Sequence, residues 1–273
     1  MKKMVRMLRA CRSLFWMQLR DGLQYRMAAL AGASTSIFWA LIEATVFRVF
    51  FLNAQGYQSA LTLEQAVSWV WLGQFLFVMQ PTMDGEIRKK IISGDVATEL
   101  LRPMDLYAHW FARITGRRLS SLMTRGALCL GVGILMPAGW GMLPPASLWA
   151  LGCFLISVMS AILLCSAYEM LMVSLRMSIA SGDAPVNALL LLGGVLSGSY
   201  LPLMLWPDFM QGFLLIQPFA GYLDIPARLC LGLMALESLP GALMLQLGWT
   251  LIFILAGRLA MGRRLQRMVV QGG

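Results

Sequence analysis

The sequence predicts an all-α, polytopic membrane protein, and three observations carry this prediction. Of its 273 residues, 59% are hydrophobic and only 13% are charged, and the mean hydropathy is +0.71. A typical soluble domain has about 25% charged residues, and a soluble fold of this size cannot hide so much apolar surface in one core. Six apolar runs also have about the length that a helix needs to cross a bilayer, roughly 20 residues.

The six predicted transmembrane helices follow one another without a marked domain boundary, so residues 1–273 are expected to form a single transmembrane domain. Each apolar run is bounded by polar residues or by Pro and Gly, which interrupt helices. The predicted spans are residues 27–52, 66–83, 119–138, 147–175, 186–206 and 239–259.

Basic residues set the predicted orientation, because Lys and Arg are retained on the cytoplasmic side of a membrane. Seven of them precede the first span and seven more lie between the second and third spans, whereas Arg228 alone is predicted to lie outside. Both termini are therefore predicted to be cytoplasmic. This placement explains the net charge of +9 without a nucleic-acid partner. The five cysteines show neither CxxC nor metal-ligand spacing, so no disulfide framework and no metal site is predicted.

Residues 1–26 are too charged to cross the membrane, but they follow a helical pattern. At 100° per residue, apolar side chains fall on one stripe and basic side chains crowd the opposite face. The stripe consists of Met4, Leu8, Cys11, Phe15 and Leu19. The pattern predicts an interfacial helix on the lipid of the inner leaflet. The alternative is a basic tail that only sets topology.

The cytoplasmic connection, residues 84–118, is long enough to have structure or function of its own. Asp84 is a candidate N-cap for a short helix that ends at Gly94. Asp95 is a candidate cap for a second short helix, which must stop near Arg102 because Pro103 follows. The first helix is expected to carry Glu86, Ile87, Arg88, Lys89, Lys90, Ile91 and Ile92.

Ile87 and Ile91 share one face of this predicted helix, which places apolar anchors inside a ring of charge. Such a composition suits a groove on a partner protein. It suits equally well a surface loop held by anionic lipid, and the composition leaves the two interpretations open.

The external connection, residues 207–238, is too apolar for a water-exposed loop and too often interrupted by Pro and Gly for a seventh span. We expect two short helices that form a re-entrant hairpin before the sixth span. Such a hairpin requires protein to cover its free backbone groups. The alternative is an interfacial loop.

Ionisable residues inside spans are costly and indicate function by default. Arg125 and Glu169 each lie about six residues inside the cytoplasmic end of a predicted span, which corresponds to a depth of roughly 9 Å. One hypothesis is an ion pair between them. The alternative is that Arg125 extends to the inner headgroups.

Glu43 and Arg48 lie in the outer half of the first predicted span. Five residues apart, they are rotated by roughly 140° and so do not share a face. Glu43 either faces a substrate path, where it favours a cationic cargo, or bonds a neighbouring helix.

No catalytic residue is predicted. Gly32-Ala33-Ser34 resembles part of an intramembrane serine protease motif, but Thr35 stands where that motif has glycine. The single histidine, His109, lies in the cytoplasmic connection and not at the depth of Ser34, so no base activates the hydroxyl.

The order of these segments resembles the membrane permeases of ABC-2 type exporters. In particular, residues 91–95 with Gly94, followed by Leu100-Leu101-Arg102-Pro103, are similar to a bacterial permease subfamily that carries a Gly and then a Leu-Leu-Arg-Pro segment at this place. The resemblance covers essentially the whole chain.

This resemblance implies a permease subunit of an ATP-driven exporter in the bacterial cytoplasmic membrane, which pairs with a second copy or a paralogue. The chain lacks GxxxxGK[ST], so ATP and Mg²⁺ are expected in a partner ABC ATPase, with no cofactor bound by this chain. The resemblance makes the helix from residue 84 to 93 the coupling helix and residues 4–19 the elbow helix. The competing hypothesis is an ion-coupled secondary transporter, although the long connection after the second span does not fit two matched three-helix repeats.

Overall fold

The computed structural model describes residues 2–53, 60–101, 104–179 and 182–267, and in these ranges all regular elements are helical. The longer helices are α1 (Lys2–Gln24), α2 (Arg26–Asn53), α3 (Leu63–Phe75), α6 (Leu106–Ser121), α8 (Leu148–Arg176), α9 (Ala184–Leu196) and α12 (Leu239–Arg267). The short helices are α4 (Gly85–Ser93), α5 (Val96–Leu100), α7 (Ala127–Leu135), α10 (Asp208–Ile216) and α11 (Asp224–Cys230). 3-10 turns follow α3 at Leu76–Met79 and lie at Leu203–Leu205, Pro218–Gly221 and Leu236–Ser238.

Three stretches of the described chain are helices that are long and apolar enough to cross a membrane: Met27–Asn53, Leu148–Arg176 and Leu236–Gln266. They agree with the first, fourth and sixth predicted spans. The other predicted spans contain shorter apolar helices, α3, α7 and α9. The structure therefore supports a helical membrane protein, and the count of six spans stays a prediction.

Two helices differ in length from the predicted spans. Helix α6 begins at Leu106, where Asp105 caps it by accepting a hydrogen bond from the amide of Ala108 at 2.8 Å. It continues through one π-helical turn, Leu122–Gly126, into α7. Residues 106–118, predicted as part of the cytoplasmic connection, are thus the first turns of a long rod that includes the third predicted span.

Helix α9 ends at Leu196, well before the predicted end of the fifth span at residue 206. The backbone at Gly198 has φ of +85°, a left-handed conformation that breaks the helix. Pro202 follows and cannot continue a helical hydrogen-bond ladder. Hydrophobicity alone did not reveal this end, because residues 199–206 remain mostly apolar.

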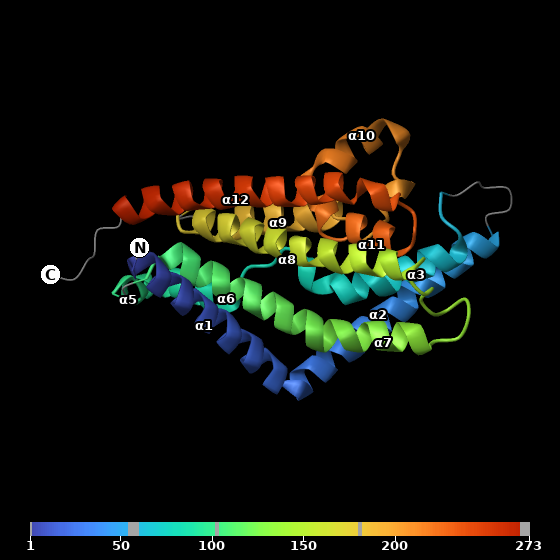
Figure 1. Ribbon diagram of the computed structural model, residues 1–273, viewed down its shortest axis with the longest axis horizontal. Coiled ribbons are helices and arrows are strands. Elements are labelled where there is room, and N and C mark those ends of the chain that lie inside the picture. The colour runs from blue at the N-terminus through green and yellow to red at the C-terminus, as the bar shows by residue number, and fades with distance from the viewer. Residues whose placement is uncertain (1, 54–59, 102–103, 180–181, 268–273) are drawn as a thin grey trace.

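Helix α8 forms the centre of the bundle. It packs along α12 and also contacts α6 and α11 (Figure 1). On this helix Tyr168 contacts the rings of Phe219 and Phe253, with centroids 5.1 and 5.2 Å away. Inside a bilayer, close packing of this kind and hydrogen bonds between helices hold a bundle together.

Helix α1 packs against α6 and turns sharply into α2 at Tyr25 (Figure 1). The two helices approach closely because glycine lies at the contact: a Cβ on Gly116 would lie 2.8 Å from the carbonyl oxygen of Phe15. Leu19 is buried and Phe15 half-buried, so part of the predicted apolar stripe faces protein. The predicted amphipathic helix is confirmed, and its contact with lipid stays a prediction.

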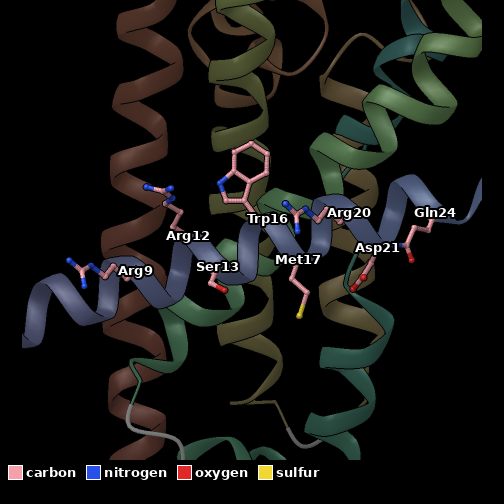
Figure 2. A pocket seen from close by; sticks show the side chains of 8 residues that line it. All are labelled: Arg9, Arg12, Ser13, Trp16, Met17, Arg20, Asp21 and Gln24. Carbon is pink, nitrogen blue, oxygen red and sulfur yellow. The ribbon is translucent and has the colours of Figure 1, made fainter.

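The outward face of α1 is cationic and also carries exposed apolar side chains. Figure 2 shows Arg9, Arg12 and Arg20 on the same open groove as Trp16 and Met17. Trp16 is 49% exposed. Tryptophan beside arginine is typical of a membrane–water interface, which agrees with the predicted position of this helix.

The predicted external connection contains two short helices, as expected. Helix α11 is deeply buried against α8, with Ile225, Ala227 and Leu229 all inaccessible. Helix α10 stands away from the bundle and exposes Phe209 and Ile216 (Figure 1). A re-entrant hairpin remains the predicted placement of this pair in a membrane.

Candidate functional site

The helices α4 and α5 lie at the end of the molecule that also holds the start of α1 and the end of α12 (Figure 1). Asp84 caps α4 as predicted, since its carboxylate accepts hydrogen bonds from the amides of Glu86 and Ile87 at 2.9 and 3.0 Å. Gly94 ends the helix with φ of +80°, which glycine adopts without a steric penalty. The local sequence therefore determines both ends of this helix.

Asp95 precedes α5 but makes no side-chain cap to its backbone, which corrects the prediction for this residue. Its carboxylate instead accepts a hydrogen bond from the hydroxyl of Ser93 at 2.6 Å. Helix α5 ends at Leu100. Leu101 is 86% exposed, whereas Arg102 and Pro103 of the predicted motif lie outside the described residues.

The apolar face of α4 is directed inward, which corrects the prediction that Ile87 is an anchor for a partner. Ile87 is 1% exposed and packs in a cluster with Trp110 of α6 and Met170 and Val173 of α8. Ile91 packs at the edge of this cluster. A fully buried aliphatic side chain contributes about 1.5–3 kcal/mol, so this face attaches α4 to the bundle.

The exposed side of the α4–α5 pair has a mixed composition. Arg88 and Lys89 lie on it, and Ile92 is 57% exposed at the end of α4. Leu100 and Leu101 add further exposed apolar surface at the end of α5. This tip is available for a partner and has the apolar centre and charged surroundings that protein interfaces favour.

A chain of ionic contacts joins the start of α4 to α6 and α8. The guanidinium of Arg117 contacts Asp84 at 3.0 Å (Nη1–Oδ2) and Glu169 at 3.2 Å (Nη2–Oε1). Arg118 contacts the second oxygen of Glu169 at 2.6 Å. Glu169 is fully buried and Arg118 is 3% exposed, so the pair is shielded from water and strongly interdependent.

The predicted ion pair between Arg125 and Glu169 is wrong. Arg125 instead donates to the hydroxyl of Ser36 on α2 at 2.6 Å and lies 4.5 Å above the ring of Phe77. The prediction failed because it began the third helix at residue 119. With α6 starting at Leu106, residues 117 and 118 reach the level of Glu169, and Arg125 lies two turns further along.

A second ionic attachment joins α4 to the connection between α8 and α9. Asp183 accepts a hydrogen bond from Arg88 at 2.7 Å (Nε–Oδ2) and forms an ion pair with Arg176 at the end of α8. These two guanidinium groups lower the pKa of the Asp183 carboxyl below its ordinary value. The carboxylate is therefore held ionised between α4 and the end of α8.

Further ion pairs stabilise the α4–α5 pair internally. Lys90 pairs with Glu99 of α5, which also lies 3.7 Å from Nε2 of His109. Glu86 pairs with Arg113 of α6. The sequence pattern did not reveal these partners or the roles of Arg117, Arg118 and Asp183. The one feature of the sequence that indicates them is the cap at Asp105. It makes α6 begin early enough for residues 113 and 117 to lie beside α4.

The remaining predicted residues lie in α2. Arg48 donates a hydrogen bond to the carbonyl oxygen of Gly139, and its guanidinium lies 4.4 Å from the centre of the Trp140 ring. Glu43 lies beside Gln74 of α3. The two side chains thus contact different neighbours.

Comparison with known proteins agrees with this architecture. Residues 33–272 match the family model described as ABC-2 family transporter protein. No curated protein and no solved structure matches the chain. The family match covers most of the described helices, including the α4–α5 pair and the central helix α8. The chain therefore belongs to the ABC-2 family of transporter proteins and is a membrane permease component of an ABC transporter.

Proposed function

We propose that the chain is the permease subunit of an ATP-driven exporter of the bacterial cytoplasmic membrane, with both termini and the α4–α5 pair on the cytoplasmic side. It works with a second permease, either a copy or a paralogue. An ABC ATPase subunit binds ATP and Mg²⁺ and docks on the α4–α5 pair. The permease converts motion of the ATPase into movement of a substrate out of the cell.

One observation carries this proposal: the α4–α5 pair is anchored internally and exposed at its tip. Ile87 and the ion pairs of Asp84 and Asp183 attach it to the bundle, while Ile92 and Leu101 remain exposed. A segment that only contacts lipid does not need ionic attachments to both α6 and the α8–α9 connection. A segment that passes force from a partner to the spans needs such attachments.

The contacts define the route of that force. A displacement of α4 moves Asp84 and, through Arg117, the buried Glu169 of α8. Helix α8 packs along α12 and against α11, so its movement repositions the centre of the bundle. Packed helices shift between discrete arrangements and do not deform continuously, which suits alternating access.

The test is purification of the tagged protein from its native host in mild detergent, followed by identification of co-purifying proteins and an assay of ATP hydrolysis. We expect an ABC ATPase to co-purify with the wild type and to be lost in the double variant Ile92→Asp, Leu101→Asp. The matched control is the double variant Phe209→Asp, Ile216→Asp, which places the same two charges at similarly exposed apolar sites on α10 and should retain the ATPase.

Two results contradict the proposal in different ways. Retention of the ATPase by the double variant would place its contact elsewhere on the permease. A stable wild-type protein with neither ATPase nor hydrolysis would exclude an ATP-driven exporter and favour an ion-coupled secondary transporter.

A further inference from the structure

A cavity of about 420 Å³ lies between α2 and the segment that follows α9. Its wall is aromatic and aliphatic, and of the described side chains that line it, Glu43 alone carries a charge. Glu43, Phe47 and Phe50 come from α2, and Tyr200, Leu201 and Leu205 from the other side. Cavities of this size and composition, with few polar groups, are typical of sites for small organic ligands.

The carboxylate lies at membrane depth. Glu43 is 16 residues beyond Met27, where the stretch long enough to span begins, and this separation corresponds to about 24 Å along the helix. That distance places Glu43 in the outer half of the span. The amide of Gln74, a buried residue of α3, lies beside it, so the neighbouring helix presents a polar group to the carboxylate.

No described Lys or Arg forms an ion pair with Glu43. The basic residue next along α2, Arg48, is directed to Gly139 and Trp140, and Arg125 contacts Ser36 and Phe77. A carboxylate inside a membrane is costly without a counter-charge. A cation that enters the cavity supplies that charge.

The aromatic residues of the wall add a second attraction for a cation. The faces of Phe and Tyr rings attract positive charge at short range, and Phe47, Phe50 and Tyr200 all line the cavity. The same wall buries an apolar body. An anion of equal size meets the Glu43 carboxylate and no described basic side chain in this lining, so the cavity distinguishes charge sign as well as shape.

We propose that this cavity binds the transported substrate and that the substrate belongs to the class of lipophilic organic cations. The positive centre lies against Glu43 and the apolar body against Phe47, Tyr200 and Leu201. This inference rests on the proposed function, because a cargo site in the outer half of the first span requires that the chain forms the export path.

The experiment uses the purified permease–ATPase complex in lipid nanodiscs and measures equilibrium binding of radiolabelled tetraphenylphosphonium without ATP. We expect saturable binding to the wild type that Glu43→Gln weakens about tenfold and that Glu43→Asp weakens less. The control Glu64→Gln removes the same charge from an exposed position at the start of α3 and should bind as the wild type does.

A second measurement needs no variant of the cavity. Tetraphenylborate has the same shape with negative charge, and we expect it neither to bind the wild type saturably nor to displace tetraphenylphosphonium. Equal affinity of the wild type and Glu43→Gln, or equal binding of the two ions, would overturn the inference.

The same samples separate this inference from the proposed function. A complex that retains its ATPase and hydrolyses ATP, but lacks Glu43-dependent binding of tetraphenylphosphonium, would refute the cation site and leave the exporter intact. Absence of an ATPase from the wild-type preparation would refute the exporter whatever the binding result.

Discussion

The two ends of the bundle differ in how their helices are held together. At the end that carries α4 and α5, carboxylates of α4, α8 and the α8–α9 connection pair with arginines of neighbouring elements, as Asp84, Glu169 and Asp183 show. Toward the other end, the ion pair that the structure describes joins Asp224 to Arg228 within one helix, and hydrogen bonds such as those of Arg48 to Gly139 and Gln246 to Gly221 join different elements. The first end is therefore held together by ion pairs between elements, and the second by hydrogen bonds and apolar packing.

This difference suits a transporter driven from one side. Ion pairs with two or three partners fix both distance and direction between elements, so they carry a displacement. Apolar helix faces in a membrane can exchange protein neighbours for lipid at small cost. Substitutions at the end that carries α4 should therefore reduce stability, and the loss should be largest where the altered contact is most deeply buried.

The largest effect is expected for the buried pair of Arg118 and Glu169. Arg118→Met leaves a fully buried carboxylate without its closest partner and should destabilise the protein by about 3–5 kcal/mol. Fluorescence-detected size exclusion after a temperature series measures the loss. The double variant Arg118→Met, Glu169→Met removes both charges and should recover most of the stability. No recovery would show that the two side chains do not act as a pair.

A smaller effect is expected where α4 packs on the bundle. Ile87→Ala removes a buried side chain from the cluster around Trp110 and should cost about 2–4 kcal/mol. Ile92→Ala changes an exposed residue of the same helix and should change stability by less than about 0.5 kcal/mol. Thermal unfolding of both variants in detergent measures the difference, and equal losses would contradict the inward orientation of Ile87.

The weakest of the three contacts is the exposed attachment at Asp183. Its carboxyl has a lowered pKa in the folded protein, so its ion pairs stabilise the fold above the ordinary pKa of about 3.9 and are lost as pH falls through the lower folded value. The melting temperature of Asp183→Asn should therefore lie slightly below that of the wild type at pH 7, and the difference should begin to shrink below about pH 4 and vanish once the pH lies below the lowered folded value. A difference that grows on acidification would be inconsistent with this assignment.

The sequence was sufficient for features that depend on neighbouring residues. The cap at Asp84 and the helix end at Gly94 need only a few residues around them, and the amphipathic face of α1 follows from its period. The family resemblance followed from the order of such segments. These predictions concern interactions within one stretch of chain, which composition and spacing encode directly.

Features that depend on the alignment of distant elements could not be predicted. Whether Arg118 or Arg125 meets Glu169 depends on how α6 and α7 align with α8, and the two arginines lie about two turns apart along the chain. Ile87 shows a related limit: the sequence predicts an apolar face on α4 but not whether the bundle or a partner covers it. The early end of α9 was hidden because apolar residues continue beyond Leu196.

The central claim is that ionic attachments carry motion from α4 to the spans, and hydrogen exchange of the permease–ATPase complex tests it most directly. A non-hydrolysable ATP analogue should change amide exchange in both α4–α5 and α8 of the wild type. In the double variant Arg88→Gln, Arg117→Gln, the change should remain in α4–α5 and disappear from α8. The control Arg20→Gln, Arg263→Gln removes two exposed charges outside the α4–α5 pair and should respond as the wild type does. An undiminished response of α8 in the first double variant would contradict the account.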